Sequence, residues 1–263
     1  MITRICKECG KKFETYQSNV DRGQGKFCSR SCGVKYNNRK KRNEKREKAR
    51  NNPLGWNADL AYLSGLITSD GSLRQNRPIM NFSSKDKSLV KQVQEIAENY
   101  LDTYDCSVHP DSHDNWRYVF TSRKFYYFLE NMGLMPNKSN KLGKLQIPDN
   151  MFYDWLRGEI DGDGCFYKAE DKYLTLSISS GSKKFLQWIK GRLKKYGLLT
   201  GKGSIYDRDG THSIGDRQIN ATTAYVLSLF HKDSINITNK IYEGANYFLD
   251  RKYKIVKEFK VIT

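Results

Sequence analysis

Two stretches of the chain decide its fold: residues 63–71 read LSGLITSDG, and residues 156–164 read LRGEIDGDG. Each is an apolar segment typical of a helix, with glycine at its third position, a second small residue four positions later, and Asp-Gly at its end. Small residues at this spacing let two helices pack with their backbones in contact. We therefore expect the two segments to pair, which would bring Asp70 and Asp163 side by side.

Asp70 and Asp163 are unfavourable at these places, because a carboxylate in the last turn of a helix faces the negative end of the helix dipole. Two adjacent carboxylates also repel each other unless cations lie between them. Mg²⁺ binds carboxylate and backbone oxygens, and in such sites it promotes the hydrolysis of phosphodiesters. The pattern therefore predicts a Mg²⁺ site made by Asp70 and Asp163, helped by the backbone carbonyls of Ser69 and Gly162.

Both stretches resemble the LAGLIDADG motif of homing endonucleases, in the single-chain form that carries two copies. The second copy fits closely, whereas the first departs at Thr68, where the family often has an acid, and at Ser64 and Ser69, where it has alanines. The last Asp of the motif, which is the family's metal-binding acid, is present in both copies. The resemblance implies a site-specific double-strand DNA endonuclease.

The resemblance also implies a lysine from each half near the attacking water. Lys138 and Lys240 each follow an asparagine at corresponding places of the two halves, so repeat symmetry favours them as catalytic residues. Lys141, Lys144 and Arg251 lie nearby in the sequence and remain alternatives.

The rest of the chain repeats as well. In each half the motif is followed by alternating strands, an amphipathic helix, a second strand pair and an aromatic-rich helix. In the second half, we expect residues 217–220 in the second strand pair and residues 225–230 in the aromatic-rich helix. The pattern predicts an α+β fold, a pseudo-twofold pair of αββαββα units with two antiparallel DNA-binding sheets, plus a small N-terminal zinc-binding domain. The expected divisions are 1–37 for a four-cysteine zinc finger, 38–52 for a basic linker, 53–148 for the first half and 149–263 for the second.

Four cysteines lie near the N-terminus, as the pair Cys6 and Cys9 and the pair Cys28 and Cys32. In an intracellular protein this spacing favours a tetrahedral zinc site with four cysteine ligands over two disulfides. A segment of under about 40 residues cannot form a stable core alone, so Zn²⁺ would supply the folding energy. The pattern resembles the small treble-clef zinc fingers of phage and bacterial nucleases.

The chain has a formal net charge of +17, concentrated at its N-terminus, where residues 1–50 hold 16 Lys and Arg against 5 Asp and Glu. Such an excess indicates a polyanionic partner, of which nucleic acid is the usual one. Residues 39–50, RKKRNEKREKAR, are good helix formers with almost no apolar side chain, so they form either a solvated spacer or a helix along phosphates.

The candidate DNA-contacting residues come from this basic segment and from the strands after each motif, where Arg, Gln and Asn can read purine edges. They are Arg39, Lys40, Lys41, Arg42 and Arg46 in the segment, Arg74, Gln75, Asn76, Arg77 and Asn81 in the first half, and Lys168, Arg217, Gln218 and Asn220 in the second.

No apolar run in the sequence reaches membrane-spanning length, and the first residues show no signal-peptide core. We therefore expect an intracellular, cytoplasmic protein of a bacterial or phage-infected cell, or of an organelle, acting as a monomer on double-stranded DNA. Two alternatives remain on the same scaffold: a maturase that binds intron RNA, and a DNA-binding regulator that does not cleave. The presence of both Asp70 and Asp163 favours the endonuclease.

Overall fold

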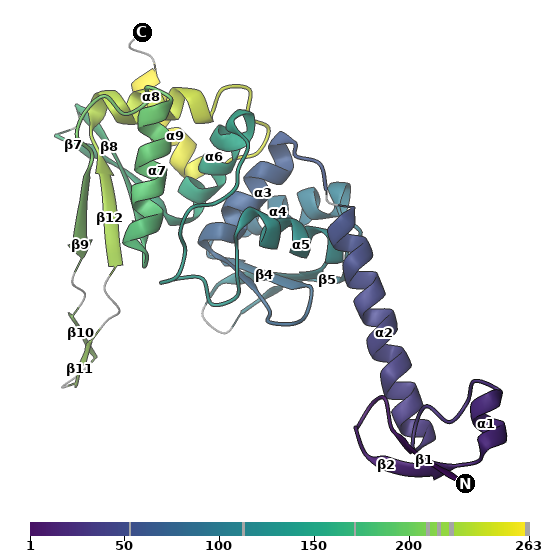
Figure 1. The fold of residues 1–263 in the computed structure, drawn as a ribbon. Coiled ribbons are helices and arrows are strands. Elements are labelled where there is room, and N and C mark those ends of the chain that lie inside the picture. Colours follow the sequence, from purple (N-terminus) through teal and green to yellow (C-terminus); the bar gives the residue numbers. More distant parts are fainter. Residues whose placement is uncertain are drawn as a thin grey trace. The chain divides into compact units, whose positions relative to one another are not determined.

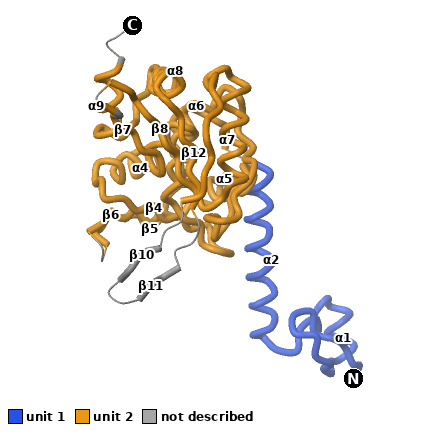
Figure 2. The backbone as a smooth tube through the Cα atoms, turned by 90° about the vertical axis from the view of Figure 1, so that its left-hand side faces the viewer, with its two compact units in different colours: residues 1–52 blue, residues 53–263 orange. Residues whose placement is uncertain are grey.

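The protein is described from a computed structural model, which covers residues 1–52, 54–111, 114–170, 172–208, 211–214, 217–220 and 224–260. Within these ranges, the side chains of residues 105, 169, 211–214, 217–220 and 260 are outside the description. The chain forms two compact units, Met1–Asn52 and Pro53–Thr263, which Figure 2 draws in blue and orange.

The first unit is a small hairpin followed by two helices. Its elements are β1 (Ile2–Ile5), β2 (Lys12–Thr15), α1 (Gln17–Asp21) and α2 (Arg30–Asn51). Strands β1 and β2 are antiparallel, and Ile2 is opposite Thr15. Gly10 adopts a φ of 71° in the turn between them, a conformation that favours glycine. The Ser29 side chain caps α2 by accepting a hydrogen bond from the Cys32 backbone N–H at 3.2 Å.

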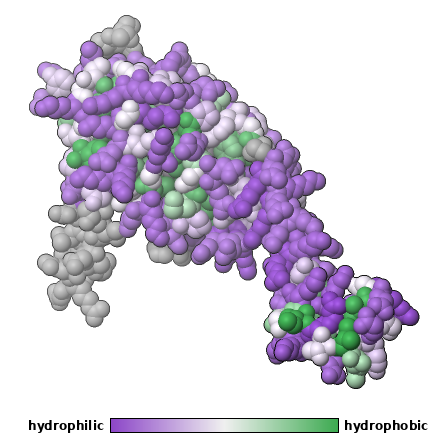
Figure 3. All heavy atoms as spheres, viewed as in Figure 1, coloured by the Kyte–Doolittle hydropathy of each residue, from purple (hydrophilic) through white to green (hydrophobic). Residues whose placement is uncertain are grey.

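Helix α2 continues without interruption past residue 37, where we expected the zinc finger to end and the basic linker to begin. Its charged and polar side chains leave Ala49 as its one buried residue. Figure 3 shows the visible side of this helix covered by hydrophilic residues. The basic segment is thus a continuation of the helix that begins beside Cys28 and Cys32, and it has no apolar face to pack against a core.

The second unit contains the two repeated halves, each with four strands in one antiparallel sheet (Figure 1). The sheet orders are β3-β4-β6-β5 and β7-β8-β12-β9, and β10 and β11 form a separate pair. The first half consists of α3 (Ala58–Ser69), β3 (Gly71–Leu73), β4 (Ile79–Ser84), α4 (Lys87–Tyr100), β5 (Tyr104–Pro110), β6 (Trp116–Thr121) and α5 (Arg123–Met132). The second consists of the short turn η1 (Asp149–Met151), α6 (Phe152–Asp163), β7 (Gly164–Ala169), β8 (Tyr173–Ser180), α7 (Lys183–Lys195), β9 (Ser204–Arg208), β10 (Thr211–Ile214), β11 (Arg217–Asn220), β12 (Ala224–Leu229), α8 (His231–Ile241) and α9 (Asp250–Lys260).

The predicted α+β architecture of two αββαββα units is confirmed, with two differences in the second half. Residues 225–230 were expected to be helical, but Ala224–Leu229 is strand β12, paired with both β8 and β9. Residues 226–229 are all buried, and a short buried run of this kind cannot be assigned to helix or strand from periodicity alone. Arg217–Asn220 was expected in the main sheet, but it pairs with Thr211–Ile214 instead.

Helices α3 and α6 pack against each other at the centre of the second unit, and glycines make this contact possible. A Cβ atom on Gly65 would lie 2.1 Å from the Trp155 backbone oxygen, and one on Gly158 would lie 2.2 Å from the Tyr62 backbone oxygen. No side chain fits at either place, so the two backbones touch directly, as the spacing of small residues predicts.

An amphipathic helix packs on the inner face of each sheet. Helix α4 packs on β4 and β6 through its buried Val90 and Val93, and α7 packs on β8 and β12 through Leu186 and Ile189. Each sheet is therefore buried on one side and leaves its other side available for contacts. In the described part of the chain, no helix is both long enough and apolar enough to cross a membrane.

Candidate active site

The two motif aspartates meet where α3 and α6 end. Asp70 caps the C-terminus of α3, and Asp163 is the last residue of α6. A Cβ on Gly162 would lie 3.2 Å from Asp70 Oδ2, which shows how closely the Asp70 carboxylate approaches the end of α6. Burial, followed by the charge of Asp70, raises the pKa of Asp163 to about 6. Burial also raises the pKa of Asp70, although the charges of Lys252 and Lys138 oppose it.

Lys138 reaches this site from the loop after α5. Its side chain is 9% exposed, and its Nζ donates a hydrogen bond to the Ser69 backbone oxygen at 2.8 Å. Burial lowers the pKa of Lys138, while the charges of Glu159, Asp163 and Asp70 act in the opposite direction. The structure therefore brings Lys138 next to the motif carboxylates.

Lys252, on α9, occupies the corresponding place in the second half. Its Nζ donates to the backbone oxygens of Ile160 and Asp161, both at 2.7 Å, and of Gly162 at 3.1 Å. Gly162 precedes Asp163 as Ser69 precedes Asp70, so each lysine donates to the backbone oxygen just before its motif aspartate. Burial lowers the pKa of Lys252 to about 8, although the charge of Asp161 opposes this shift.

The expected equivalence of Lys138 and Lys240 is corrected by these contacts. Lys240 is an exposed residue of α8 that pairs with Glu243 at 2.7 Å, and that pairing raises its pKa. Arg251 pairs with Asp86 at 3.0 Å, while Lys141 and Lys144 are exposed.

A buried polar network places Lys252, and the repeat pattern of the sequence does not predict it. The Asp161 carboxylate accepts hydrogen bonds from the Leu249 backbone N–H and the Tyr62 hydroxyl, both at 2.9 Å. Arg157 donates to the backbone oxygens of Tyr247 at 2.9 Å and Ile241 at 2.6 Å. These bonds hold the segment before α9 against α6. The sequence did contain a signal for this network, the charged pair Arg157 and Asp161, four positions apart in the motif helix. Charged side chains buried in such a helix need hydrogen-bond partners elsewhere in the fold.

The donor set at the ends of α3 and α6 fits a hard divalent cation. The carboxylates of Asp70 and Asp163 and the backbone oxygens of Ser69 and Gly162 are the oxygen ligands that Mg²⁺ prefers. Burial, followed by the repulsion between the carboxylates, raises the pKa of Asp163, and such a cation would relieve that repulsion.

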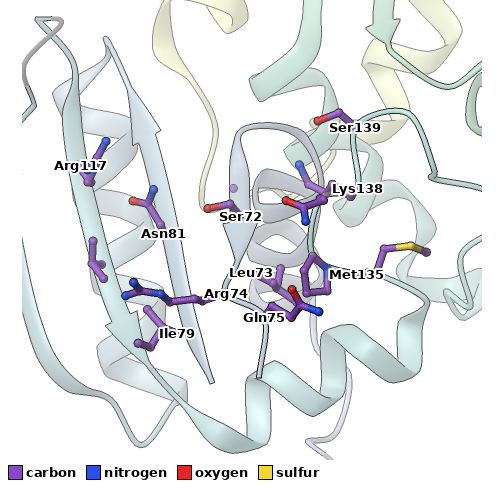
Figure 4. Close-up of a pocket in the computed structure, with 14 residues that line it drawn as sticks. Ser72, Leu73, Arg74, Gln75, Ile79, Asn81, Arg117, Met135, Lys138 and Ser139 are labelled. Carbon is purple, nitrogen blue, oxygen red and sulfur yellow. The ribbon is translucent and has the colours of Figure 1, made fainter. Parts of the chain in front are cut away.

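The outer face of the first sheet continues from Lys138 into a hollow. Figure 4 shows Asn81 and Arg117 on its strands, Arg74 just after β3, and Lys138 on the facing loop. Arg74, Gln75 and Asn81 were expected DNA contacts, and they line this hollow together with Arg117, which lies opposite Ser83 in the sheet register and was not among the candidates. Arg117 pairs with Asp111. The remaining candidates of this half, Asn76 and Arg77, are exposed in the turn between β3 and β4.

The outer face of the second sheet differs from that of the first in the side chains that the structure describes there. Tyr167 and Ser177 are exposed or half-buried on its outer face, but Lys168 alternates to the opposite side, next to the buried Phe166. There Lys168 pairs with Glu258 of α9, so it does not lie on the outer face as expected. The side chains of the other three candidates, Arg217, Gln218 and Asn220, are outside the described residues.

The four N-terminal cysteines form a compact cluster in the first unit. The sulfur atoms of Cys6, Cys9, Cys28 and Cys32 all lie within 4.8 Å of one another. Tetrahedral Zn–S bonds of about 2.3 Å place sulfurs nearly 4 Å apart, so the cluster fits Zn²⁺. Desolvation alone would raise the pKa of Cys6, but backbone hydrogen bonds led by that of Cys9 lower it to about 6. The neighbouring Cys9 and Cys32 thiols raise the pKa of Cys28 to about 12.

The basic side chains of α2 are exposed along its length. Arg39 pairs with Glu8 at 2.9 Å, which ties the helix to the loop between the first two cysteines. Lys40 lies 3.9 Å from Glu44, and Arg42 donates to the Asn38 backbone oxygen at 3.4 Å. Lys41 and Arg46 are exposed on the same helix.

A comparison with known protein families finds a match in the first half of the second unit. A family model described as a LAGLIDADG-like domain matches residues 57–133. No curated protein matches the sequence.

Three solved structures illustrate the proteins to which the chain is similar, each with a TM-score of 0.48. A structure of the homing endonuclease I-DmoI is 19% identical and covers 71% of this chain and 96% of its own. Full-length DUF199/WhiA from Thermatoga maritima is 16% identical, with coverages of 84% and 67%. The homing endonuclease I-WcaI, bound to its DNA recognition sequence, is 13% identical, with coverages of 80% and 91%. I-DmoI has also been solved in complex with DNA and Ca, and with DNA and Mn.

Proposed function

We propose that the protein is a site-specific, Mg²⁺-dependent DNA endonuclease that cuts both strands of a double-stranded target. The observation that carries the proposal is the convergence of Asp70 and Asp163 at the ends of two touching helices, each with its own buried lysine. The match of residues 57–133 to a LAGLIDADG-like domain supports it.

Each residue of the site has a distinct role in the proposed reaction. Asp70 and Asp163, with the Ser69 and Gly162 carbonyl oxygens, would hold the divalent cation, which supplies charge stabilisation and an activated water at the phosphate. Lys138 and Lys252 would each place an ammonium near one scissile phosphate, where it stabilises charge that develops in the transition state.

The DNA would lie along the outer faces of the two sheets. Arg74, Asn81 and Arg117 give the first sheet donors for base edges and phosphates, next to Lys138. We further propose that the Cys cluster binds one structural Zn²⁺ and that the exposed basic residues of α2 contact DNA phosphates.

Cleavage of a random-site DNA library, followed by sequencing of the ends, tests the proposed activity. We expect Mg²⁺-dependent cuts in both strands, and we expect Asp70→Asn and Asp163→Asn to lose cleavage while keeping most DNA binding. Tight DNA binding with no cleavage by the wild type would favour the non-cleaving regulator, and preferential binding of structured RNA would favour the maturase.

Elemental analysis tests the metal in the first unit. We expect one Zn²⁺ per chain in the wild type and its loss in Cys9→Ser and Cys28→Ser. Purified wild-type protein that contains no zinc and has its four cysteines joined by disulfides would contradict the assignment.

A further inference from the structure

Glu159 is a buried acid in the middle of α6 with no evident structural use. Its side chain is 1% exposed, and its Oε2 atom has no hydrogen-bond partner among the described residues. Burial, with the charge of Asp163, raises its pKa well above the ordinary range. A carboxyl group placed in this way lowers the stability of the fold, so its presence calls for another explanation.

The corresponding position of the other motif helix is apolar. When residues 63–71 are aligned with residues 156–164, Leu66 of α3 occupies the position that Glu159 has in α6, and Leu66 is fully buried. The helix contact therefore accepts an apolar side chain at this position in one half. Packing does not require an acid here, and buried groups that break a local rule are concentrated at functional sites.

Glu159 and Lys138 both face a second hollow, distinct from the one shown in Figure 4. The two residues line it together with Thr68, Ser69 and Asp163. Among the charges that act on Lys138 in favour of its ammonium form, that of Glu159 is the largest, ahead of those of Asp163 and Asp70.

The two lysines differ in how they are held. Lys252 donates to three backbone oxygens, whereas among the described residues the Lys138 ammonium donates to one, that of Ser69. An ammonium has three donors, so two of those on Lys138 are not fixed by backbone acceptors. Burial favours the neutral form of Glu159, but the Lys138 ammonium acts in the opposite direction on its pKa, as Glu159 does on that of Lys138. The charged forms of the two groups therefore attract each other, and this attraction is strong where water is excluded.

We propose that Glu159 is a positioning residue that holds the Lys138 ammonium beside Asp70 and Asp163. The lysine of the first half is then placed by the motif helix of the second half, whereas Lys252 is held by three backbone oxygens, and the acid nearest to it in charge effect, Asp161, already accepts hydrogen bonds from Tyr62 and Leu249. This role rests on the proposed endonuclease activity and adds a difference between the two strands: loss of Glu159 slows the cut that depends on Lys138 and spares the other.

Strand-resolved cleavage of the full-length protein tests this role. Glu159→Gln, which keeps the shape, and Glu159→Leu, which copies the first half, are compared with Lys138→Met in single-turnover reactions with each strand end-labelled. We expect both Glu159 variants to slow one strand about tenfold or more, the same strand that Lys138→Met slows, and to accumulate nicked DNA. Adding Glu159→Gln to Lys138→Met should have no further effect, because the group that Glu159 positions is already gone.

A stability measurement and a control separate this role from a structural one. The melting temperature of Glu159→Leu should equal or exceed that of the wild type, because a buried carboxyl group whose Oε2 has no hydrogen-bond partner among the described residues is removed. Glu98→Gln, which neutralises an exposed acid of α4, should leave both strand rates unchanged. Wild-type rates on both strands in Glu159→Gln and Glu159→Leu would overturn the proposal. So would equal slowing of both strands, or an effect that adds to that of Lys138→Met.

A chemical readout keeps the proposal testable if the wild type cuts no DNA, which would refute the endonuclease alone. Acetylation of lysines by a water-soluble reagent, quantified by peptide mass spectrometry, reports on the position of Lys138 without any substrate. We expect Lys138 to be protected in the wild type and labelled several times faster in Glu159→Gln, with Lys252 unchanged in both. Equal labelling of Lys138 in the two proteins would overturn the positioning role.

Discussion

Replacing Lys252 with Met should abolish most cleavage of one DNA strand. The Lys252 side chain is 3% exposed, so its charge acts where water is largely excluded. Its pKa of about 8 means that at pH 7 the ammonium form outnumbers the neutral form by about ten to one. The substitution therefore removes almost a full charge. Losing one group that stabilises developing charge typically lowers the rate by about 100-fold or more, which is about 3 kcal/mol of barrier.

The pH dependence of the same rate gives a second signature. Because the folded-state pKa of Lys252 is lowered to about 8, the charged form is lost as the pH rises through that value. We expect the rate on its strand to fall about tenfold per pH unit above about pH 8. Lys252→Arg, whose guanidinium stays protonated, should remove that fall even if its rate at pH 7 is lower.

Single-turnover cleavage with each strand end-labelled, over a range of pH, measures both effects. Lys240→Met is the matched control, because Lys240 is exposed and pairs with Glu243. Full rates on both strands in Lys252→Met, together with a slow strand in Lys240→Met, would refute the assignment from contacts and restore the one from repeat symmetry.

Three further predictions concern the helix contact, the carboxylates and the basic segment. Gly65→Ala should lower the free energy of unfolding in urea by roughly 3 kcal/mol or more, because its Cβ would lie 2.1 Å from the Trp155 oxygen. Gly55→Ala, which meets open space, should be near neutral, and equal stability of the two variants would contradict the close contact. Mg²⁺ affinity, measured by calorimetry, should weaken about tenfold per pH unit below about pH 6, because the raised pKa of Asp163 leaves its carboxyl protonated there; an affinity constant from pH 7 to 5 would exclude Asp163 as a ligand. Removing residues 1–52 should reduce the slope of log affinity for DNA against log salt by about 0.9 for each phosphate that the shortened protein no longer neutralises, and an unchanged slope would make α2 a solvated spacer.

The features of the fold that could be predicted from the sequence are those that depend on residue types at fixed, short spacings along the chain. The small residues and Asp-Gly of the two motifs predicted the contact of α3 with α6, and the cysteine spacing placed four thiols that the structure brings within 4.8 Å. Strand β12 was missed because six residues are too few for periodicity to distinguish a strand from a buried helix.

The position of Lys252 beside the second motif was not predicted from the sequence, for a different reason. Lys252 lies on α9, beyond the point where the two halves correspond, and buried bonds from Asp161 and Arg157 to the segment before α9 bring it back to α6. Repeat symmetry takes no account of an added helix, so it selected Lys240. Contacts between residues about 90 positions apart are a tertiary property that no window along the sequence contains.

The direct backbone contact between α3 and α6 has a consequence for the ends of the cut DNA. In the proposed endonuclease, the distance between Asp70 and Asp163 determines how far apart the two strands are cut, and hence the length of the overhang. Gly65 and Gly158 set that distance, and neither contributes to the sheet faces that would read the target. Redesign of the sheet surfaces for a new target sequence should therefore leave the overhang length unchanged.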